Sequence, residues 1–258
     1  MAPLAYITGA SSGIGQALAV RFLAAGWRLA LVARRGDALQ GWIDEQQAAP
    51  GTLALYPADV RDVASITAAG RACLAIQGLP DVVVANAGIS IGFDTAEVAD
   101  LDVMRAIYET NNIGMAATFQ PFVRAMQQRG SGRLVGMASV AGIRGLPGHG
   151  AYCASKAAVI SYCESLRGEC RPFGVSVLTL LPGYVHTPLT AQNRYAMPFS
   201  LSSSDFADRA FRAITGRSSY RVIPWQMGVA AWLMRGLPNA AFDALFKGRP
   251  RKHRQGDA

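Results

Sequence analysis

Short apolar segments alternate with stretches of helical periodicity through most of the chain, and this alternation constrains the fold more than any other feature. Six such segments lie at 4–8, 29–33, 53–56, 82–85, 134–138 and 175–181. Strands separated by helices form parallel sheets, because each helix returns the chain across the sheet before the next strand begins. The segment Val82–Ala85 is almost wholly β-branched, which is typical of a strand buried on both faces. A doubly wound parallel sheet with helices on both faces is therefore predicted, and Tyr220–Ile223 would complete it as a seventh strand.

Length and composition agree with one large α/β domain. The chain has 258 residues, of which 51% are hydrophobic and 16% charged, so it can bury a full core. We predict a single catalytic domain over residues 1–224, with a substrate loop at 183–204 and a helical extension with a basic tail at 225–258. The N-terminus has no charged leader and no run of about 18 apolar residues occurs, so neither a signal peptide nor a membrane span is expected.

The four cysteines lack the spacing of a metal site, and no metal is predicted: Cys73, Cys153, Cys163 and Cys170. We expect buried, reduced thiols and a cytoplasmic location. The net charge is +8, and half of it comes from the last twelve residues. Because the remaining arginines are scattered and not set in a stripe with aromatic residues, nucleic-acid binding is not expected. A solvated, frayed basic tail is the prediction for the C-terminus.

The first strand runs directly into a glycine-rich turn and then into a helix. Leu4–Thr8 is followed by GASSGIG at residues 9–15, and apolar residues then recur at helical spacing at Leu18, Phe22 and Leu23. Glycines let the backbone turn sharply and approach a ligand, while the free N–H groups of the helix N-terminus attract a diphosphate. Strand, glycine turn and helix together predict a Rossmann-type dinucleotide site.

The end of the second strand favours NADP(H) over NAD(H). An acidic residue there would bind a ribose 2′-hydroxyl, whereas an arginine accommodates a 2′-phosphate. Ala33 occupies the position, and Arg34 and Arg35 follow it. We interpret Asp37 as the cap of a helix over 38–47. The alternative is that Arg34 and Arg35 are two ordinary surface arginines.

A tyrosine and a lysine four residues apart form the candidate acid/base pair. If the run from Tyr152 is helical, its phenol and the ammonium of Lys156 share a face. A neighbouring cation would lower the pKa of the phenol toward working pH and make it a usable general acid or base. Ser139 follows an apolar strand at 134–138, which we expect to end at this serine, and its hydroxyl could hold a carbonyl oxygen. The plain alternative is a surface lysine beside a packed tyrosine.

Two adjacent asparagines, Asn111 and Asn112, interrupt a long helical stretch at 101–129. Asparagine competes for backbone hydrogen bonds, so the pair indicates either a local kink or a backbone carbonyl freed to hold a water molecule. Right-handed crossovers place the carboxyl ends of parallel strands along one edge of the sheet. One cleft should therefore collect the residues at the strand ends: Gly13, Arg34, Asp59, Asn86, Ser139 and Gly183.

Taken together, these motifs resemble the classical short-chain dehydrogenase/reductase family over residues 4 to 190. The resemblance rests on TGASSGIG at 8–15, Asp59, Asn86-Ala87-Gly88, Asn111, Ser139, YCASK at 152–156 and Pro182-Gly183 with Thr187. It implies that Tyr152 is the acid/base, Ser139 positions the substrate oxygen, and Lys156 binds the nicotinamide ribose and lowers the tyrosine pKa. It also implies that Asn111, three residues before Gly114, holds a water that links Lys156 to solvent.

The resemblance further implies hydride transfer between NADP(H) and a carbonyl or secondary alcohol, by a homodimer or homotetramer. The implied cofactor-binding residues are Gly9, Ser11, Ser12, Gly13, Ile14, Gly15, Arg34, Arg35, Asp59, Val60, Asn86, Ala87, Gly88, Tyr152, Lys156, Pro182, Gly183, Val185 and Thr187. Two alternatives remain. One is a catalytically idle NADP-binding redox sensor or scaffold, and the other is an epimerase or dehydratase on the same fold.

The last third of the chain is less informative. The loop at 183–204 contains five apolar residues that hint at a hydrophobic substrate: Tyr184, Leu189, Tyr195, Met197 and Phe199. His149, three residues before Tyr152, would be a pocket residue or an ordinary loop residue. Beyond the loop, two apolar helical faces are expected, with Trp225, Val229, Trp232 and Leu233 on the first and Ala241, Phe242, Leu245 and Phe246 on the second. We favour packing of these faces onto the substrate loop or a neighbouring subunit over contact with a membrane surface.

Overall fold

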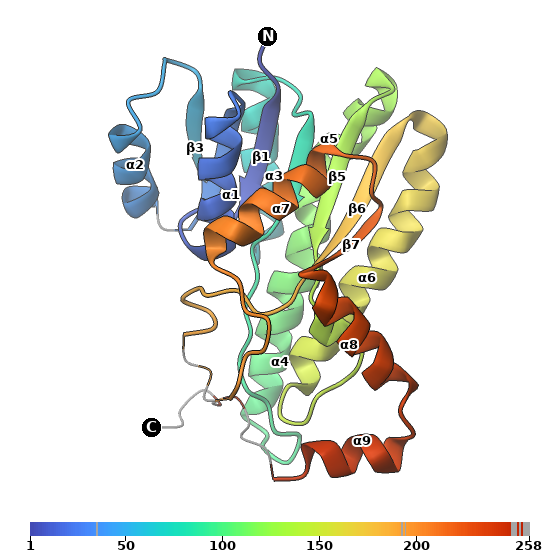
Figure 1. The fold of residues 1–258 in the computed structure, drawn as a ribbon. Helices are drawn as coiled ribbons and strands as arrows, with labels where there is room; N and C mark the ends of the chain where they lie inside the picture. Colours follow the sequence, from blue (N-terminus) through green and yellow to red (C-terminus); the bar gives the residue numbers. More distant parts are fainter. Residues whose placement is uncertain (35, 192, 194, 249–251, 253, 255–258) are drawn as a thin grey trace.

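The computed structural model describes residues 1–34, 36–191, 193, 195–248, 252 and 254, and its centre is a parallel β-sheet (Figure 1). The strands are β1 (Leu4–Thr8), β2 (Arg28–Ala33), β3 (Leu53–Pro57), β4 (Val82–Ala85), β5 (Gly132–Met137), β6 (Val175–Pro182) and β7 (Tyr220–Ile223). The strand order is β3-β2-β1-β4-β5-β6-β7. It reverses direction between β1 and β4, and ligands of doubly wound folds bind outside the strand ends at such a point.

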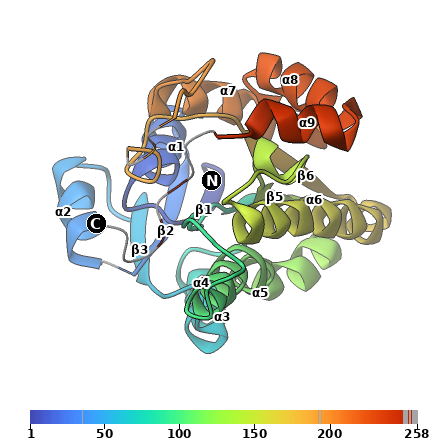
Figure 2. The same ribbon diagram turned by 90° about the horizontal axis from the view of Figure 1, so that it is seen from below.

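Helices cover both faces of this sheet. They are α1 (Gly13–Ala24), α2 (Gly36–Glu45), α3 (Val63–Ile76), α4 (Asp100–Tyr108), α5 (Gly114–Arg129), α6 (Gly150–Cys170), α7 (Ser203–Thr215), α8 (Trp225–Gly236) and α9 (Asn239–Phe246). Figure 2 shows α1 and α7 on one side of the sheet and α3, α4 and α5 on the other. The predicted fold class, with its short helical extension at the C-terminus, is confirmed.

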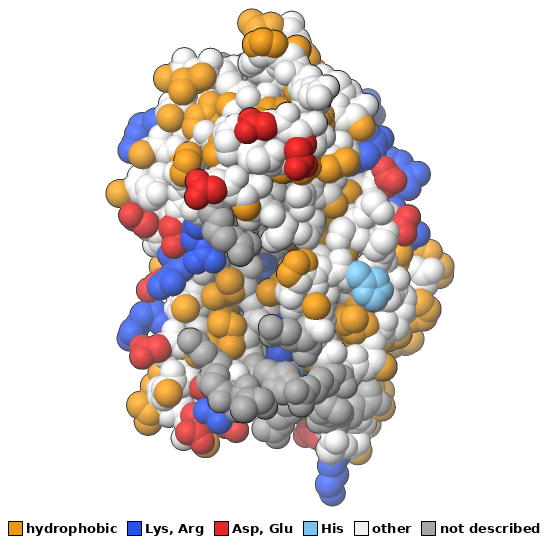
Figure 3. All heavy atoms as spheres, turned by 90° about the vertical axis from the view of Figure 1, so that its left-hand side faces the viewer, with side chains coloured by type: hydrophobic (Ala, Val, Ile, Leu, Met, Phe, Trp, Pro, Cys, Tyr) orange, Lys and Arg blue, Asp and Glu red, His pale blue; other side chains and the backbone are white. Residues whose placement is uncertain are grey.

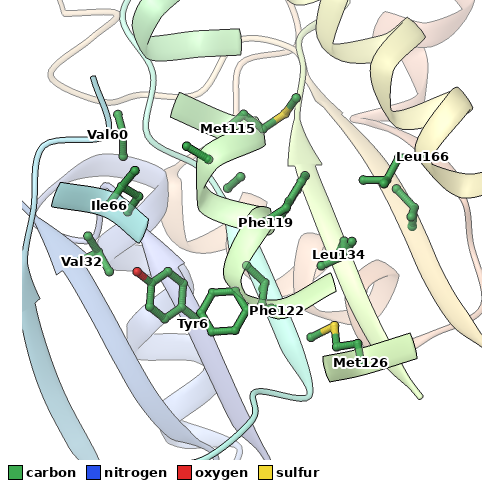
Figure 4. Close-up of a cluster of buried hydrophobic side chains, with 14 of the residues drawn as sticks. Tyr6, Val32, Val60, Ile66, Met115, Phe119, Phe122, Met126, Leu134 and Leu166 are labelled. Carbon is green, nitrogen blue, oxygen red and sulfur yellow. The ribbon is translucent and has the colours of Figure 1, made fainter. Parts of the chain in front are cut away.

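Each face of the sheet has its own hydrophobic core. Beneath α3, α5 and α6, Tyr6 of β1 packs with Ile66, Phe119 and Phe122, as Figure 4 shows. The rings of Tyr6 and Phe122 lie 4.8 Å apart between centroids. The opposite core, beneath α1 and α7, is built in the same way around other residues of the same strands, among them Ile7 and Leu31. Alternate residues of the central strands thus serve opposite faces, which fixes the strand register.

Several predicted element boundaries are confirmed, and others are wrong. β1, β4 and β7 have the bounds expected from their apolar patterns. β5, however, ends at Met137, because Ser139 is the N-cap of a short 3₁₀ turn and its hydroxyl accepts a hydrogen bond from the Ala141 N–H at 3.2 Å. α2 begins at Gly36, so Asp37 lies inside its first turn and is not the cap. A carboxylate in the first turn still favours the helix through the helix dipole.

The asparagine pair does interrupt the long helix. Residues Glu109–Ile113 form one π-helical turn between α4 and α5. Asn112 Nδ2 donates to the Ser155 carbonyl of α6 at 2.9 Å, so this turn is tied to the neighbouring helix. Single π-turns inside α-helices are frequent at functional sites, and here the turn brings Asn111 to a buried position.

The helical extension packs through a different face from the one predicted. In α8 the buried residues are Met227 and Ala231, while Trp225 and Trp232 are 68% and 73% exposed. Glycine at position 183 allows α8 to pack in this orientation, because a Cβ on Gly183 would lie only 2.7 Å from the Met227 side chain. The predicted apolar face therefore does not pack on the substrate loop, and its packing on a neighbouring subunit stays a prediction. In α9 the prediction fares better, since Phe242 is buried and the Arg144 guanidinium lies 3.9 Å from its ring centroid.

The prediction of a solvated basic tail is wrong for the two tail residues that the structure describes beyond Gly248. Arg254 Nε donates to the buried carboxylate of Asp100 at 2.8 Å, and Lys252 Nζ donates to Ser90 Oγ at 3.1 Å. Lys252 therefore contacts the loop after β4, and Arg254 contacts the first residue of α4, whose buried carboxylate is its ion-pair partner.

All four cysteines are buried and unpaired, as expected. Figure 3 shows basic and acidic side chains interspersed on the face it presents, with no continuous basic stripe among the described residues seen there. Within the described ranges, no helix is both long and apolar enough to cross a bilayer. Nor do His, Cys, Asp and Glu side chains gather into a metal-binding group in that part of the chain.

Candidate active site

A cleft of about 300 Å³ opens at the carboxyl edge of the sheet, where the strand order reverses. Most of the residues singled out from the sequence line it: Gly9, Ser11, Ser12, Gly13, Ile14, Arg34, Asp59, Val60, Asn86, Ala87, Gly88, Ser139, Tyr152, Lys156, Pro182, Gly183, Val185 and Thr187. Gly15 and Asn111 lie behind this lining, and Arg35 lies outside the described residues.

The glycine turn leaves the N-terminus of α1 open toward the cleft. Gly9 and Gly13 have φ values of +67° and +56°, which other residues adopt only with strain. Ser12 is the N-cap of α1, but its side chain makes no capping hydrogen bond and the first turn contains no acidic residue. The N–H groups and the positive end of the helix dipole are therefore available to an anionic ligand.

Gly15 lies behind the cleft lining and allows α1 to pack closely onto the glycine turn. A Cβ at this position would lie 2.1 Å from the Gly9 carbonyl oxygen and 2.6 Å from Asn86 Nδ2. Only a residue without a side chain lets α1 pack this closely onto the turn. Asn86 completes the arrangement by donating from Nδ2 to the Thr8 carbonyl at 3.0 Å. The Thr8 hydroxyl in turn accepts from the N–H groups of Asn86 and Ala87, both at 3.1 Å, so the turn after β4 is locked against β1.

The β3 end of the cleft carries two arginines, Arg34 and Arg61, and one carboxylate, Asp59. Arg34 Nη1 lies 3.9 Å from Asp59 Oδ2, and their side chains are 63% and 38% exposed. An ion pair this exposed is worth little, so the guanidinium remains available to a stronger anion such as a phosphate. Arg34 directly follows β2, and a carboxylate at this strand end would repel a 2′-phosphate.

The opposite end of the cleft holds three polar side chains from two elements. Tyr152 and Lys156 project from one face of α6, as their spacing predicts, and Ser139 comes from the turn after β5. The Ser139 side chain lies close enough to the Tyr152 phenol to counteract in part the rise of its pKa on burial. Lys156 is buried, and its Nζ donates to the Met137 carbonyl at 2.8 Å while lying 5.8 Å from the Tyr152 ring centroid.

The expected depression of the tyrosine pKa is absent from this arrangement. Burial raises the pKa of Tyr152 to about 12, and the Ser139 side chain opposes this only in part. Burial also lowers the pKa of Lys156 to about 8. The prediction fails because the ammonium is directed at the Met137 carbonyl and the phenol sits in a poorly solvated site. At neutral pH the phenol is consequently protonated and suited to donating a proton.

Asn111 lies behind the cleft lining and holds the helix that carries Tyr152 and Lys156. Its Nδ2 donates to the Ile89 carbonyl and to Ser155 Oγ, both at 3.0 Å, and its Oδ1 accepts from the Ile89 N–H at 2.9 Å. Ser155 precedes Lys156 on α6, and Ile89 lines the cleft. The amide side chain therefore joins the loop after β4 to the helix that carries Tyr152 and Lys156. Water binding by the Asn111 backbone stays a prediction.

Some cleft residues were not predicted from the sequence: Val32, Ala33, Ala58, Arg61, Ile89, Thr110, Met137, Ala138, Pro188 and Thr190. Each lies within three positions of a residue that was predicted, so extending every motif along its strand end would have found them. Of the five apolar loop residues, Leu189 lines the cleft, whereas Tyr195 packs edge-on against His149 with 5.8 Å between ring centroids. His149 thus holds the loop and is not part of the cleft lining.

Comparison with known proteins identifies the architecture. The family model that describes short chain dehydrogenases matches residues 3–197. An oxidoreductase of Myxococcus xanthus, described as uncharacterized, is 40% identical over 240 residues, which make up 93% of this chain and 94% of the relative. The chain belongs to the classical short-chain dehydrogenase/reductase family. It is accordingly an oxidoreductase that depends on a pyridine nucleotide.

Other members of this short-chain dehydrogenase/reductase family differ in what they bind. Estradiol 17-beta-dehydrogenase 1 of Rattus norvegicus is 40% identical over 188 residues, which cover 70% of this chain but only 54% of that enzyme. A short-chain dehydrogenase/reductase from Burkholderia phymatum, solved in complex with NAD, has a TM-score of 0.81 and 25% identity, with 97% of each chain covered. An actinorhodin polyketide ketoreductase variant, solved with NADPH, has a TM-score of 0.79 and 28% identity, with 88% of this chain and 97% of that one covered.

Proposed function

We propose that this short-chain dehydrogenase/reductase transfers hydride between NADP(H) and a carbonyl or secondary alcohol, with Tyr152 as the general acid/base. The observation that carries the proposal is the meeting of Ser139, Tyr152 and Lys156 in the same cleft as the open N-terminus of α1. A cleft with both features can hold a dinucleotide along its length and a small carbonyl compound at one end.

The glycine turn and the open N-terminus of α1 fit a dinucleotide, and each part of the cleft has a proposed role. The turn at 9–15 would bind the diphosphate, Asp59 and Val60 the adenine end, and Lys156 the nicotinamide ribose. The nicotinamide end would rest on Pro182, Gly183, Val185 and Thr187. When bound, the nicotinamide supplies or accepts the hydride, while the protein supplies orientation and a proton.

The preference for NADP(H) is supported by the charge at the end of β2. Arg34 lines the cleft with a largely exposed side chain, and a guanidinium pairs well with phosphate oxygens. Arg35 or Ser12 would assist it. The position that would need a carboxylate to select a 2′-hydroxyl is occupied by Ala33.

In the direction of reduction, Ser139 and Tyr152 donate hydrogen bonds to the carbonyl oxygen of the substrate. Negative charge grows on this oxygen as the hydride reaches the carbon, so the two donors stabilise the transition state more than the ground state. Tyr152 then gives its proton to the oxygen and the alcohol forms. Asn111 holds the helix and the loop in register. The phenol is protonated at neutral pH, as a general acid in this direction requires.

The lining also supports a substrate with an apolar body. Ile89, Pro188 and Leu189 border the cleft, and the loop that carries the last two reaches back over α1 through Thr187. Loops in such positions can close over a substrate and exclude water.

The test is NADPH consumption by the purified protein over a panel of ketones and aldehydes, with NADPH binding measured in parallel. We expect turnover of several apolar ketones. Tight NADPH binding without consumption of any compound would favour a redox sensor or scaffold. Product formation without net cofactor consumption would favour an epimerase or dehydratase.

A further inference from the structure

The described C-terminal residues are anchored beside the cleft by a buried ion pair. Arg254 donates to Asp100 through Nε at 2.8 Å and Nη2 at 3.3 Å, and its Nη2 lies 3.7 Å from Glu97 Oε2. Asp100 is only 2% exposed, and Arg254 also forms a parallel β-bridge with Gly92. The Asp100 carboxylate is buried while the Arg254 side chain is 31% exposed, so these contacts hold Arg254 against the loop after β4 and the first residue of α4.

Two residues earlier, Lys252 spans the two segments that border the substrate end of the cleft. Its Nζ donates to Ser90 Oγ at 3.1 Å and to the Leu189 carbonyl at 3.5 Å. Leu189 lines the cleft, and so does Ile89, which precedes Ser90. The anchored tail therefore places an ammonium group where the loop after β4 meets the substrate loop.

Within the described part of the chain, the Lys252 ammonium donates to two acceptors and has a third N–H donor left over. An ammonium has three N–H donors, and both recorded acceptors are neutral oxygens. Burial lowers the pKa of Lys252 to about 8, and its charge helps to lower the pKa of His149. Among the described cleft-lining residues the carboxylate is Asp59, which follows β3 at the far end of the sheet. Lys156 thus lines the cleft, and Lys252 contacts Leu189, which also lines it, while the substrate end has no carboxylate among the described lining residues.

We infer that Lys252 is a specificity-determining residue that selects carbonyl substrates carrying an anionic group, with a carboxylate as the simplest case. The inference rests on the proposed function and narrows its substrate class. A carboxylate would supply the third acceptor through a charge-assisted hydrogen bond. Together with Ile89 and Leu189, the site then fits an amphipathic substrate, in which an apolar chain separates the ketone from the anion.

The kinetic test uses methyl ketones of increasing chain length that end in a carboxylate, each paired with its methyl ester. For at least one chain length we expect wild type to prefer the acid by about tenfold or more in kcat/KM. Lys252→Met should lower the acid-to-ester ratio of kcat/KM to about one, and Lys252→Arg should keep part of the preference. Lys247→Met is the matched control, because Lys247 is an exposed lysine of the same tail, and it should retain the wild-type preference.

A binding test separates this inference from the proposed function. Calorimetric titration of saturated carboxylates of the same lengths into the NADP⁺-loaded protein requires no turnover, and Lys252→Met should weaken their affinity by about tenfold. Equal affinities in both proteins, or equal acid-to-ester ratios, would overturn the inference even if ketones are reduced. A variant that loses acid and ester rates alike would also overturn it, since Lys252 would then only hold the loop.

Discussion

Gly15→Ala is the most severe test of the glycine turn at 9–15, because the added side chain would collide with backbone atoms of that turn. The added Cβ would lie 2.1 Å from the Gly9 carbonyl oxygen, so that oxygen must retreat by about 0.9 Å to reach the 3.0 Å limit of real Cβ contacts. Asn86 Nδ2, at 2.6 Å, would be displaced as well. Overpacking costs typically 1–3 kcal/mol, and because backbone relaxes poorly we expect about 3 kcal/mol here. For a chain of this size, Tm should fall by roughly 6–12 °C.

The same displacement moves the N–H groups that would face the diphosphate, so NADPH affinity should fall by about tenfold or more. Gly41→Ala is the matched control, since Gly41 lies within α2 and no atom would come within 4 Å of its Cβ. Alanine should stabilise that helix by about 1 kcal/mol and leave NADPH binding unchanged. Thermal melts followed by circular dichroism and fluorescence titration with NADPH measure both quantities. Wild-type Tm and wild-type affinity in Gly15→Ala would refute the packing argument.

Three further predictions address cofactor choice, pH and assembly. Arg34→Ala should weaken NADPH binding by about tenfold and leave NADH binding unchanged, because only the 2′-phosphate would meet this guanidinium; equal losses for both cofactors would contradict the phosphate assignment. Burial lowers the pKa of Lys156 to about 8, so its ammonium is lost as pH rises through that value. The kcat/KM for reduction of a neutral ketone should therefore fall near that pH, in wild type and in Lys252→Met alike. A flat pH profile would count against a role for the Lys156 charge. The outward face of α8 should contact a second copy of the chain, and Trp232→Glu should then shift the sedimentation coefficient toward that of a monomer, whereas an unaltered assembly would exclude this face.

Local patterns were enough to predict the fold and most of the cleft. The strands are continuous apolar runs such as Val82–Ala85, and their alternation with helices determines a parallel sheet whose carboxyl ends share one edge. Motifs that lie far apart in the sequence therefore meet without any knowledge of side-chain contacts. Ser139 and Lys156 illustrate this, because each follows from its own strand end or helix face.

What could not be predicted depends on contacts between distant segments. Arg254 finds its buried partner Asp100 at a separation of 154 residues, and no local pattern in either segment signals the pair. The apolar face of α8 was recognised correctly, but its direction depends on the small residues at Gly183 and Gly228, which let the other face approach the sheet. The pKa of Tyr152 depends on burial and on where the Lys156 ammonium points, and neither follows from a spacing of four.

The central claim is that the Tyr152 hydroxyl delivers the proton in an NADPH-dependent carbonyl reduction. The most direct test is kcat for the best ketone of the panel in wild type and in Tyr152→Phe, which removes only the hydroxyl group. Loss of a positioned general acid should lower kcat by about 10²–10⁴-fold while the Kd for NADPH stays near the wild-type value. Equal kcat values in the two proteins would contradict the claim.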